Sequence, residues 1–113
     1  MPHKAKSLTS DLGPGPYHLL CGGDELGCIE RLAPGIASGW LEGTLQPSAA
    51  WPTVAPLFAG EAAALRHADR WPDAWQTAWD AAQGPGVTLR DRSGANWPVD
   101  VHVDALTVRL QLR

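Results

Sequence analysis

The sequence predicts a single α+β domain, in which three strands, two helices and three further strands form an antiparallel sheet with a helical layer. Two observations predict this class. In the first and last thirds of the chain, apolar and polar residues alternate with the period of a half-buried strand. In the middle third, the apolar period changes to that of an amphipathic helix, and glycine and proline separate the segments. We expect the two-helix segment to cover one face of the sheet.

The length supports one domain and leaves no room for a second core, because the chain has 113 residues. With 44% hydrophobic residues, such a chain can bury roughly two-thirds of its extended surface without a metal or disulfides. Residues 1–16 end in alternating glycine and proline, which oppose regular structure. We therefore expect a flexible tail over 1–16 and the α+β domain over 17–113.

The first strands are predicted at residues 17–21 and 27–32, on either side of a glycine-rich loop, and form a hairpin. In one register Cys21 lies opposite Cys28, which would bring two thiols within bridging distance. We favour the alternative of two reduced, half-buried side chains, because the chain has no Cys-x-x-Cys spacing. A third strand is predicted over 39–45.

Two helices are predicted next, the first from about Thr53 and the second over 71–83. Glu61 lies mostly off the apolar stripe of the first helix. Trp75 and Trp79 share one face of the second, and we expect them to be mostly core, packed on the aliphatic side of the sheet. The short connection between the helices favours a helical hairpin or a sharply bent pair.

The last third predicts a three-stranded antiparallel meander. A two-residue turn at 104–105 would pair Val101 with Val108, and a five-residue loop at 92–96 would join the other two strands. Both hairpins then place every aliphatic residue on one side of the sheet, an agreement that a slip of one residue would destroy. These residues are Val87, Leu89, Val99, Val101, Val103, Leu106, Val108, Leu110 and Leu112.

The opposite side of the meander carries the catalytic candidates, His102 and Asp100. A carboxylate beside an imidazole can orient a general base. The predicted register, however, places Asp100 opposite Arg109 in an ordinary cross-strand ion pair. We favour a solvated polar face, because no nucleophile, metal-ligand set or phosphate-binding loop accompanies these residues. The sequence thus predicts no metal and no cofactor, and it favours a non-enzymatic protein.

Charge and hydropathy exclude some classes of partner. The net charge is −3 and the nine lysines and arginines form no extended cluster, which disfavours nucleic acid and anionic membrane surfaces. No apolar run is long enough for a signal peptide or a membrane span. We therefore expect a cytoplasmic protein, and the composition is what a GC-rich, bacterial-type genome would encode.

Six tryptophans in a small, mildly acidic domain favour a binding module that contacts another protein, as an inhibitor, immunity-type protein or adaptor. The candidate contact residues are Trp71, Trp40 and Trp51. One alternative is a small-molecule-binding protein or enzyme with a pocket between helices and sheet, using tryptophan platforms and the polar pair of the meander. Another is a structural domain that forms a homodimer through an edge strand.

Overall fold

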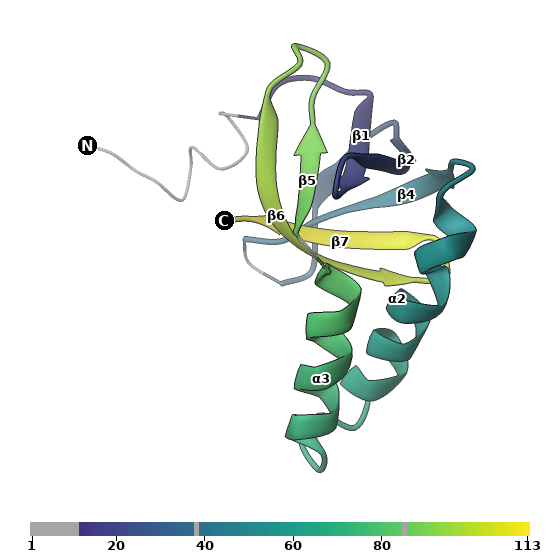
Figure 1. Cartoon of the computed structure of the whole chain (residues 1–113). Coiled ribbons are helices and arrows are strands. Elements are labelled where there is room, and N and C mark those ends of the chain that lie inside the picture. Colours follow the sequence, from purple (N-terminus) through teal and green to yellow (C-terminus); the bar gives the residue numbers. More distant parts are fainter. Residues whose placement is uncertain (1–11, 38, 85) are drawn as a thin grey trace.

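The computed structural model describes residues 12–37, 39–84 and 86–113. It confirms the α+β class, with strands before and after a two-helix segment and every strand pair antiparallel (Figure 1). The elements are β1 Tyr17–Cys21, β2 Asp24–Ile29, β3 Ala33–Pro34, β4 Leu41–Pro47, α2 Trp51–Leu65, α3 Pro72–Gln83, β5 Val87–Arg90, β6 Asn96–Asp104 and β7 Thr107–Leu112. No helix of the described ranges is long and apolar enough to cross a membrane.

The sheet closes into a barrel, because β2 pairs with β4 as well as with β1. Around the barrel the order is β1, β2, β4, β7, β6, β5 and back to β1, with the short β3 added beside β4. Two glycines allow backbone segments to approach each other closely where β2 meets β4. A Cβ on Gly27 would lie 2.5 Å from the carbonyl oxygen of Gln46, and one on Gly43 would lie 2.6 Å from that of Arg31.

The core fills the inside of this barrel. All of the nine aliphatic positions predicted for the meander are buried except Leu106, which is exposed, and Leu112, which is half-buried. Leu19 and Ile29 from the first hairpin join them, and α2 contributes Phe58. The predicted aliphatic side of the meander is therefore the inner wall of the barrel.

The register of the meander differs from the prediction by two residues in each hairpin. Val101 lies opposite Leu110, and Val87 lies opposite Val99. The last turn consists of Ala105 and Leu106, with a positive φ of 58° at Ala105. A shift of two residues keeps every side chain on its predicted face, since side chains alternate along a strand. The faces of the strand residues were thus predicted correctly, whereas Leu106 falls in the turn and the cross-strand partners differ.

The first hairpin also has a tighter turn than predicted. Cys21 lies opposite Asp24 across a two-residue glycine turn, and Cys28 lies opposite His18. The register that would pair the two cysteines is therefore wrong. Both thiols are free and half-buried, which is the alternative that the sequence favoured.

The packed domain begins earlier than residue 17. Leu12 is buried in the core, and the backbone N–H of Gly13 donates to the carboxylate of Asp91 at 3.0 Å. The Tyr17 hydroxyl donates to the carbonyl oxygen of Gly13 at 2.9 Å. Residues 12–16, assigned to the tail from the sequence, thus pack against the barrel, while residues 1–11 lie outside the described ranges.

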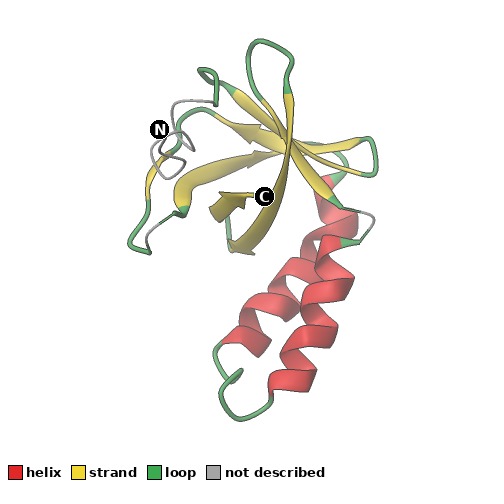
Figure 2. Ribbon diagram, turned by 90° about the vertical axis from the view of Figure 1, so that its left-hand side faces the viewer, coloured by secondary structure: helices red, strands yellow, loops and turns green. Residues whose placement is uncertain are grey.

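The two helices lie side by side and project from the barrel (Figures 1 and 2). Helix α2 packs against β6 and β2, and α3 packs against α2. At the end of α3 the Gln83 amide donates to the carbonyl oxygen of Val101 at 3.0 Å. Closure of the sheet already buries its aliphatic side, so α3 is not needed as a cover. The expectation that Trp75 and Trp79 are mostly core is wrong: both are half-buried.

Candidate functional site

A buried carboxylate and a histidine meet where the helices join the barrel. Glu61 of α2 is fully buried, and its Oε1 lies 2.9 Å from Nδ1 of His102 on β6. Its Oε2 accepts a hydrogen bond of 2.7 Å from the indole Nε1 of Trp75 on α3. An ionised carboxylate can only accept, so beside the ionised form of Glu61 it is Nδ1 that carries a hydrogen toward Oε1. The remaining ring nitrogen, Nε2, is left for other partners.

The helical spacing explains how a glutamate comes to be buried here. Glu61 follows Phe58 by three residues and therefore lies on the same side of α2, which faces the barrel. A fully buried carboxylate is costly unless its oxygens are bonded. Trp75 and His102 satisfy one oxygen each, so the arrangement joins α2, α3 and β6 through a single side chain.

The imidazole of His102 is held between two indole rings. Its ring centroid lies 4.8 Å from that of Trp79 and 5.2 Å from that of Trp40. Trp79 in turn lies 5.9 Å from Trp75. The His102 side chain keeps 19% of its surface exposed. It is thus fixed by a carboxylate and two aromatic rings while one part of it still faces solvent.

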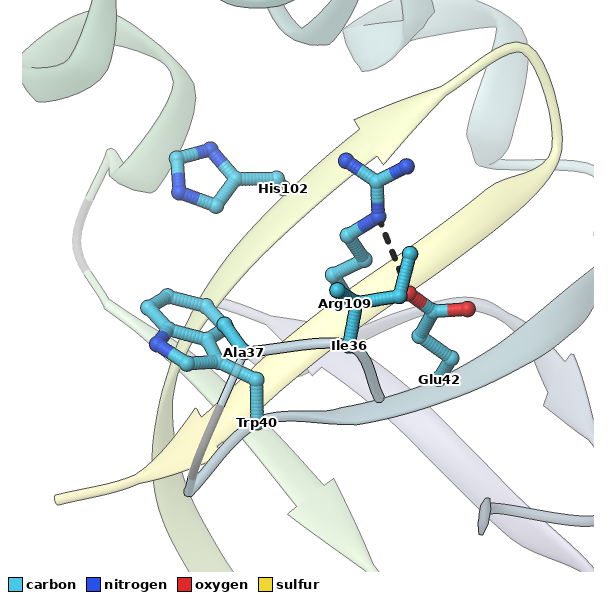
Figure 3. A pocket seen from close by; sticks show the side chains of 6 residues that line it. All are labelled: Ile36, Ala37, Trp40, Glu42, His102 and Arg109. Carbon is cyan, nitrogen blue, oxygen red and sulfur yellow. Dashed lines mark ion pairs between the residues drawn. The ribbon is translucent and has the colours of Figure 1, made fainter. Parts of the chain in front are cut away.

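That exposed part borders two hollows. The first has a volume of about 360 Å³ and is lined by Ile36, Ala37, Trp40, Glu42, His102 and Arg109 (Figure 3). The second, of about 260 Å³, is lined by Glu61, Ala62, Leu65, Arg66, His102, Asp104 and Arg109. His102 and Arg109 line both, because they are direct register partners on β6 and β7.

The first hollow has an aromatic end and a charged end. Trp40 lies beside His102 at one end, and at the other Arg109 Nε pairs with Glu42 Oε2 at 3.3 Å. Figure 3 shows the terminal nitrogens of Arg109 pointing away from Glu42. The lining of this hollow therefore combines an indole surface, a guanidinium whose terminal nitrogens point away from Glu42, and a carboxylate.

This arrangement allows binding beside His102, because the contact of its Nδ1 with Glu61 holds the ring in one orientation. Among the described residues, no group of three or more histidine, cysteine or carboxylate side chains is placed to hold a metal ion. Burial, with Asp24 nearby, raises the pKa of the Cys21 thiol, and burial with nearby carboxylates does the same for Cys28. Raised thiol pKa values argue against a cysteine nucleophile.

The sequence offered Asp100 as the carboxylate beside His102, but the carboxylate that contacts His102 in the structure is Glu61. Asp100 accepts from Nε of Arg113 at 2.8 Å, and the predicted pair of Asp100 with Arg109 is absent because the register is shifted by two residues. Glu61, which sequence reasoning missed, takes the place of Asp100. Its spacing from Phe58 is the signal that could have placed it on the buried side of the helix.

The three candidate contact tryptophans have different environments. Trp40 lines the first hollow. Trp51 is 8% exposed and packs on Phe58 in the core, which leaves it little surface for a partner. Trp71 is 63% exposed between the two helices.

A second buried carboxylate, Asp91, lies in the loop between β5 and β6 and is 3% exposed. It accepts from the Ser93 hydroxyl and backbone, the Trp97 indole, and the backbone N–H groups of Gly13 and Ala95. These hydrogen bonds, those of Ser93 and Trp97 foremost, hold the pKa of Asp91 well below its usual range. Its donors come from its own loop, the next strand and the amino end, so its role is structural.

No protein-family model, curated protein or solved structure matches the chain.

Proposed function

We propose that the protein binds a small molecule in the first hollow, the space of about 360 Å³ between Trp40 and the Arg109–Glu42 pair. The observation that carries this proposal is the fixed orientation of His102. A fully buried glutamate and two indoles hold its ring against the hollow. Binding sites combine apolar walls with a few oriented polar groups, as this one does.

The cost of the arrangement supports a role beyond folding. A well-packed apolar cluster at this junction would avoid the desolvation of a buried carboxylate, and such replacements are often neutral or stabilising. Retaining Glu61 keeps His102 in one orientation and keeps its Nε2 available. Preorganisation of this kind lowers the entropy lost when a ligand binds. We keep the cytoplasmic location expected from the sequence as part of the proposal.

The direct test is a fragment screen by two-dimensional ¹H–¹⁵N NMR of the labelled protein. We expect a subset of small aromatic or polar fragments to shift the amide signals of Trp40, Glu42, His102 and Arg109 in a saturable manner. Trp40→Ala should abolish these shifts, because it removes the aromatic wall of the hollow. Mass spectrometry of the freshly purified native protein would reveal a ligand that is retained through purification.

The matched control is His18→Ala. His18 also contacts a glutamate, Glu25, at 3.0 Å, but it lies on β1 and lines neither hollow. This variant should bind every fragment as the unchanged protein does. The proposal would be contradicted if no fragment caused saturable shifts around the hollow. It would also be contradicted if such shifts persisted in Trp40→Ala.

A second candidate function is contact with a protein partner, favoured by the 63% exposure of Trp71 between the helices. A large exposed indole is typical of binding hot spots. Affinity capture should then recover a stoichiometric partner that Trp71→Ala loses and Trp40→Ala retains. Recovery of no such partner at low and physiological salt would remove this candidate.

Pairing of edge strands in a homodimer has less support. With the barrel closed, the exposed edge among the described strands belongs to β3, whose two residues include Pro34. A short edge with a proline is a poor template for strand addition. Sedimentation at high protein concentration tests this alternative, and a monomer would end it.

A further inference from the structure

We propose that the ligand of the first hollow is a free amino acid with an aromatic or other apolar side chain, and this inference rests on the small-molecule-binding function proposed above. The charges on the wall, the position of its apolar surface and the size of the space each lead to this class.

The charged end of the hollow carries both signs. Arg109 uses Nε for Glu42, and its terminal nitrogens point away from that contact (Figure 3). Glu42 uses Oε2 for Arg109, which leaves Oε1 without that contact. A guanidinium binds a carboxylate through parallel donors, and a carboxylate binds an ammonium through charge-assisted hydrogen bonds. The pair can therefore receive the carboxylate and the ammonium of one zwitterion while it stays intact.

A ligand with a single charge fits this wall less well. An anion would meet the Glu42 carboxylate beside Arg109, and a cation would meet the guanidinium beside Glu42, so each would face a like charge at close range. A zwitterion offers an opposite charge to both groups. The two formal charges of the wall cancel, as do those of an amino acid near neutral pH.

The other end of the hollow is apolar. The indole of Trp40 forms this end with Ala37 beside it, and the Ile36 side chain adds apolar surface nearer the Arg109–Glu42 pair (Figure 3). Ile36 is 96% exposed, so a bound apolar side chain would cover surface that water now contacts. Burial of apolar area contributes about 25 cal/mol per Å². The ligand is therefore expected to carry an apolar group next to its charged atoms.

The volume limits the size of the ligand. About 360 Å³ is near the lower end of the roughly 300–1,000 Å³ found for small-molecule pockets. A single amino acid is of this scale, whereas a dinucleotide cofactor is not. The hollow is also continuous with exposed surface at Arg109, whose side chain is 51% exposed, so the charged end is accessible to a free ligand.

The test uses four compounds that differ in one feature each: L-phenylalanine, N-acetyl-L-phenylalanine, L-phenylalaninamide and L-alanine. The first has both charges and an aromatic ring, the next two lack the ammonium charge or the carboxylate, and the last lacks the ring. Titrations followed by ¹H–¹⁵N NMR give the dissociation constants. We expect L-phenylalanine to bind at least tenfold more tightly than each of the other three.

Variants assign each preference to its group. Arg109→Gln should remove the preference for L-phenylalanine over its amide, and Glu42→Gln should remove the preference over the N-acetyl derivative. The matched control is Arg113→Gln. It disrupts the ion pair between Arg113 Nε and Asp100 Oδ1, which are 2.8 Å apart, and neither residue lines the hollow. It should leave all preferences unchanged. Thermal unfolding of each variant verifies that the fold is intact.

The outcomes separate this inference from the proposed function. If fragments bind at the hollow but the N-acetyl and amide derivatives bind as tightly as L-phenylalanine, the amino-acid class is wrong and small-molecule binding stands. If neither the fragments nor the four compounds shift signals at the hollow, both proposals are wrong. Preferences that persist in both Arg109→Gln and Glu42→Gln would also overturn the assignment.

Discussion

Asp91 and Glu61 are both buried carboxylates, at 3% and 0% exposure, but their surroundings differ. Asp91 is surrounded by hydrogen-bond donors from its loop, the next strand and the amino end, and it lines neither hollow. Glu61 has two partners, and one of them, His102, faces two hollows. A carboxylate saturated by donors stabilises a loop, whereas one that holds a partly exposed histidine can organise a site.

The largest expected effect is that of Glu61→Ala. It leaves the Trp75 indole and the His102 ring without their acceptor, and each unsatisfied buried donor costs about 1–3 kcal/mol. We expect a loss of roughly 2–5 kcal/mol in the free energy of unfolding, measured by urea denaturation. The control Glu30→Ala removes an exposed glutamate and should change stability by less than about 0.5 kcal/mol. An equal effect of the two substitutions would contradict the importance of the Glu61 contacts.

The second largest effect should come from protonation of the Asp91 carboxylate, and it should be visible in the pH dependence of stability. Hydrogen bonds from Ser93 and Trp97, the largest causes, lower the pKa of Asp91 in the folded state. An unfolded aspartate has a pKa of about 3.9. The stabilisation by this carboxylate is therefore fully present above about pH 4 to 5 and is lost as the pH falls through the folded-state value.

The thermal unfolding midpoint of the unchanged protein should accordingly decrease as the pH is lowered from about 5 into strongly acidic conditions. This is about the range over which the Asp91 carboxylate becomes protonated. Asp91→Asn should have a lower midpoint at neutral pH and a flatter dependence on pH, so that the two curves approach each other in acid. Parallel curves would show that another group controls the acid response.

A matched pair of tryptophan substitutions sharpens the comparison further. Trp75 and Trp97 each donate an indole N–H to a buried carboxylate, at 2.7 Å and 3.0 Å. Trp75→Phe leaves Glu61 with one partner and should cost about 2 kcal/mol, whereas Trp97→Phe leaves Asp91 with several and should cost about 1 kcal/mol or less. Urea denaturation measures both. A larger loss for Trp97→Phe would reverse our assignment of the two roles.

The smallest effect should come from Trp71→Ala. This indole is 63% exposed and takes no part in either carboxylate cluster, so the free energy of unfolding should change by less than about 0.5 kcal/mol. Fluorescence should show that Trp71 emits as a water-exposed indole. A loss above 1 kcal/mol would mean that the connection between the helices contributes to the packed core.

The sequence was most informative where side chains alternate. The inner face of β5, β6 and β7 follows from the period of two, and a register error of two residues does not change it. The exact partners depended on turn chemistry. The turn at Ala105 and Leu106 uses a positive φ at an alanine, which the usual preference for glycine, asparagine or aspartate at such positions does not indicate.

The candidate site required contacts that no local pattern contains. His102 was recognisable as a chemical group, but its partner Glu61 precedes it by 41 residues and comes from a helix. Barrel closure is equally non-local, because β2 and β4 meet across the connecting β3 segment. Without closure, the aliphatic face requires a helical cover, which is why the predicted core positions of Trp75 and Trp79 differ from their half-buried positions in the structure.

The pairing of β2 with β4 also bears on where the closed barrel can open. This pairing spans three residue pairs, from Gly27 opposite Pro47 to Ile29 opposite Leu45, and proline has no backbone N–H to contribute. If these few contacts open, two unpaired strands become available to other molecules without global unfolding. The shortest pairing in the closed barrel is therefore the position at which we expect the sheet to open first.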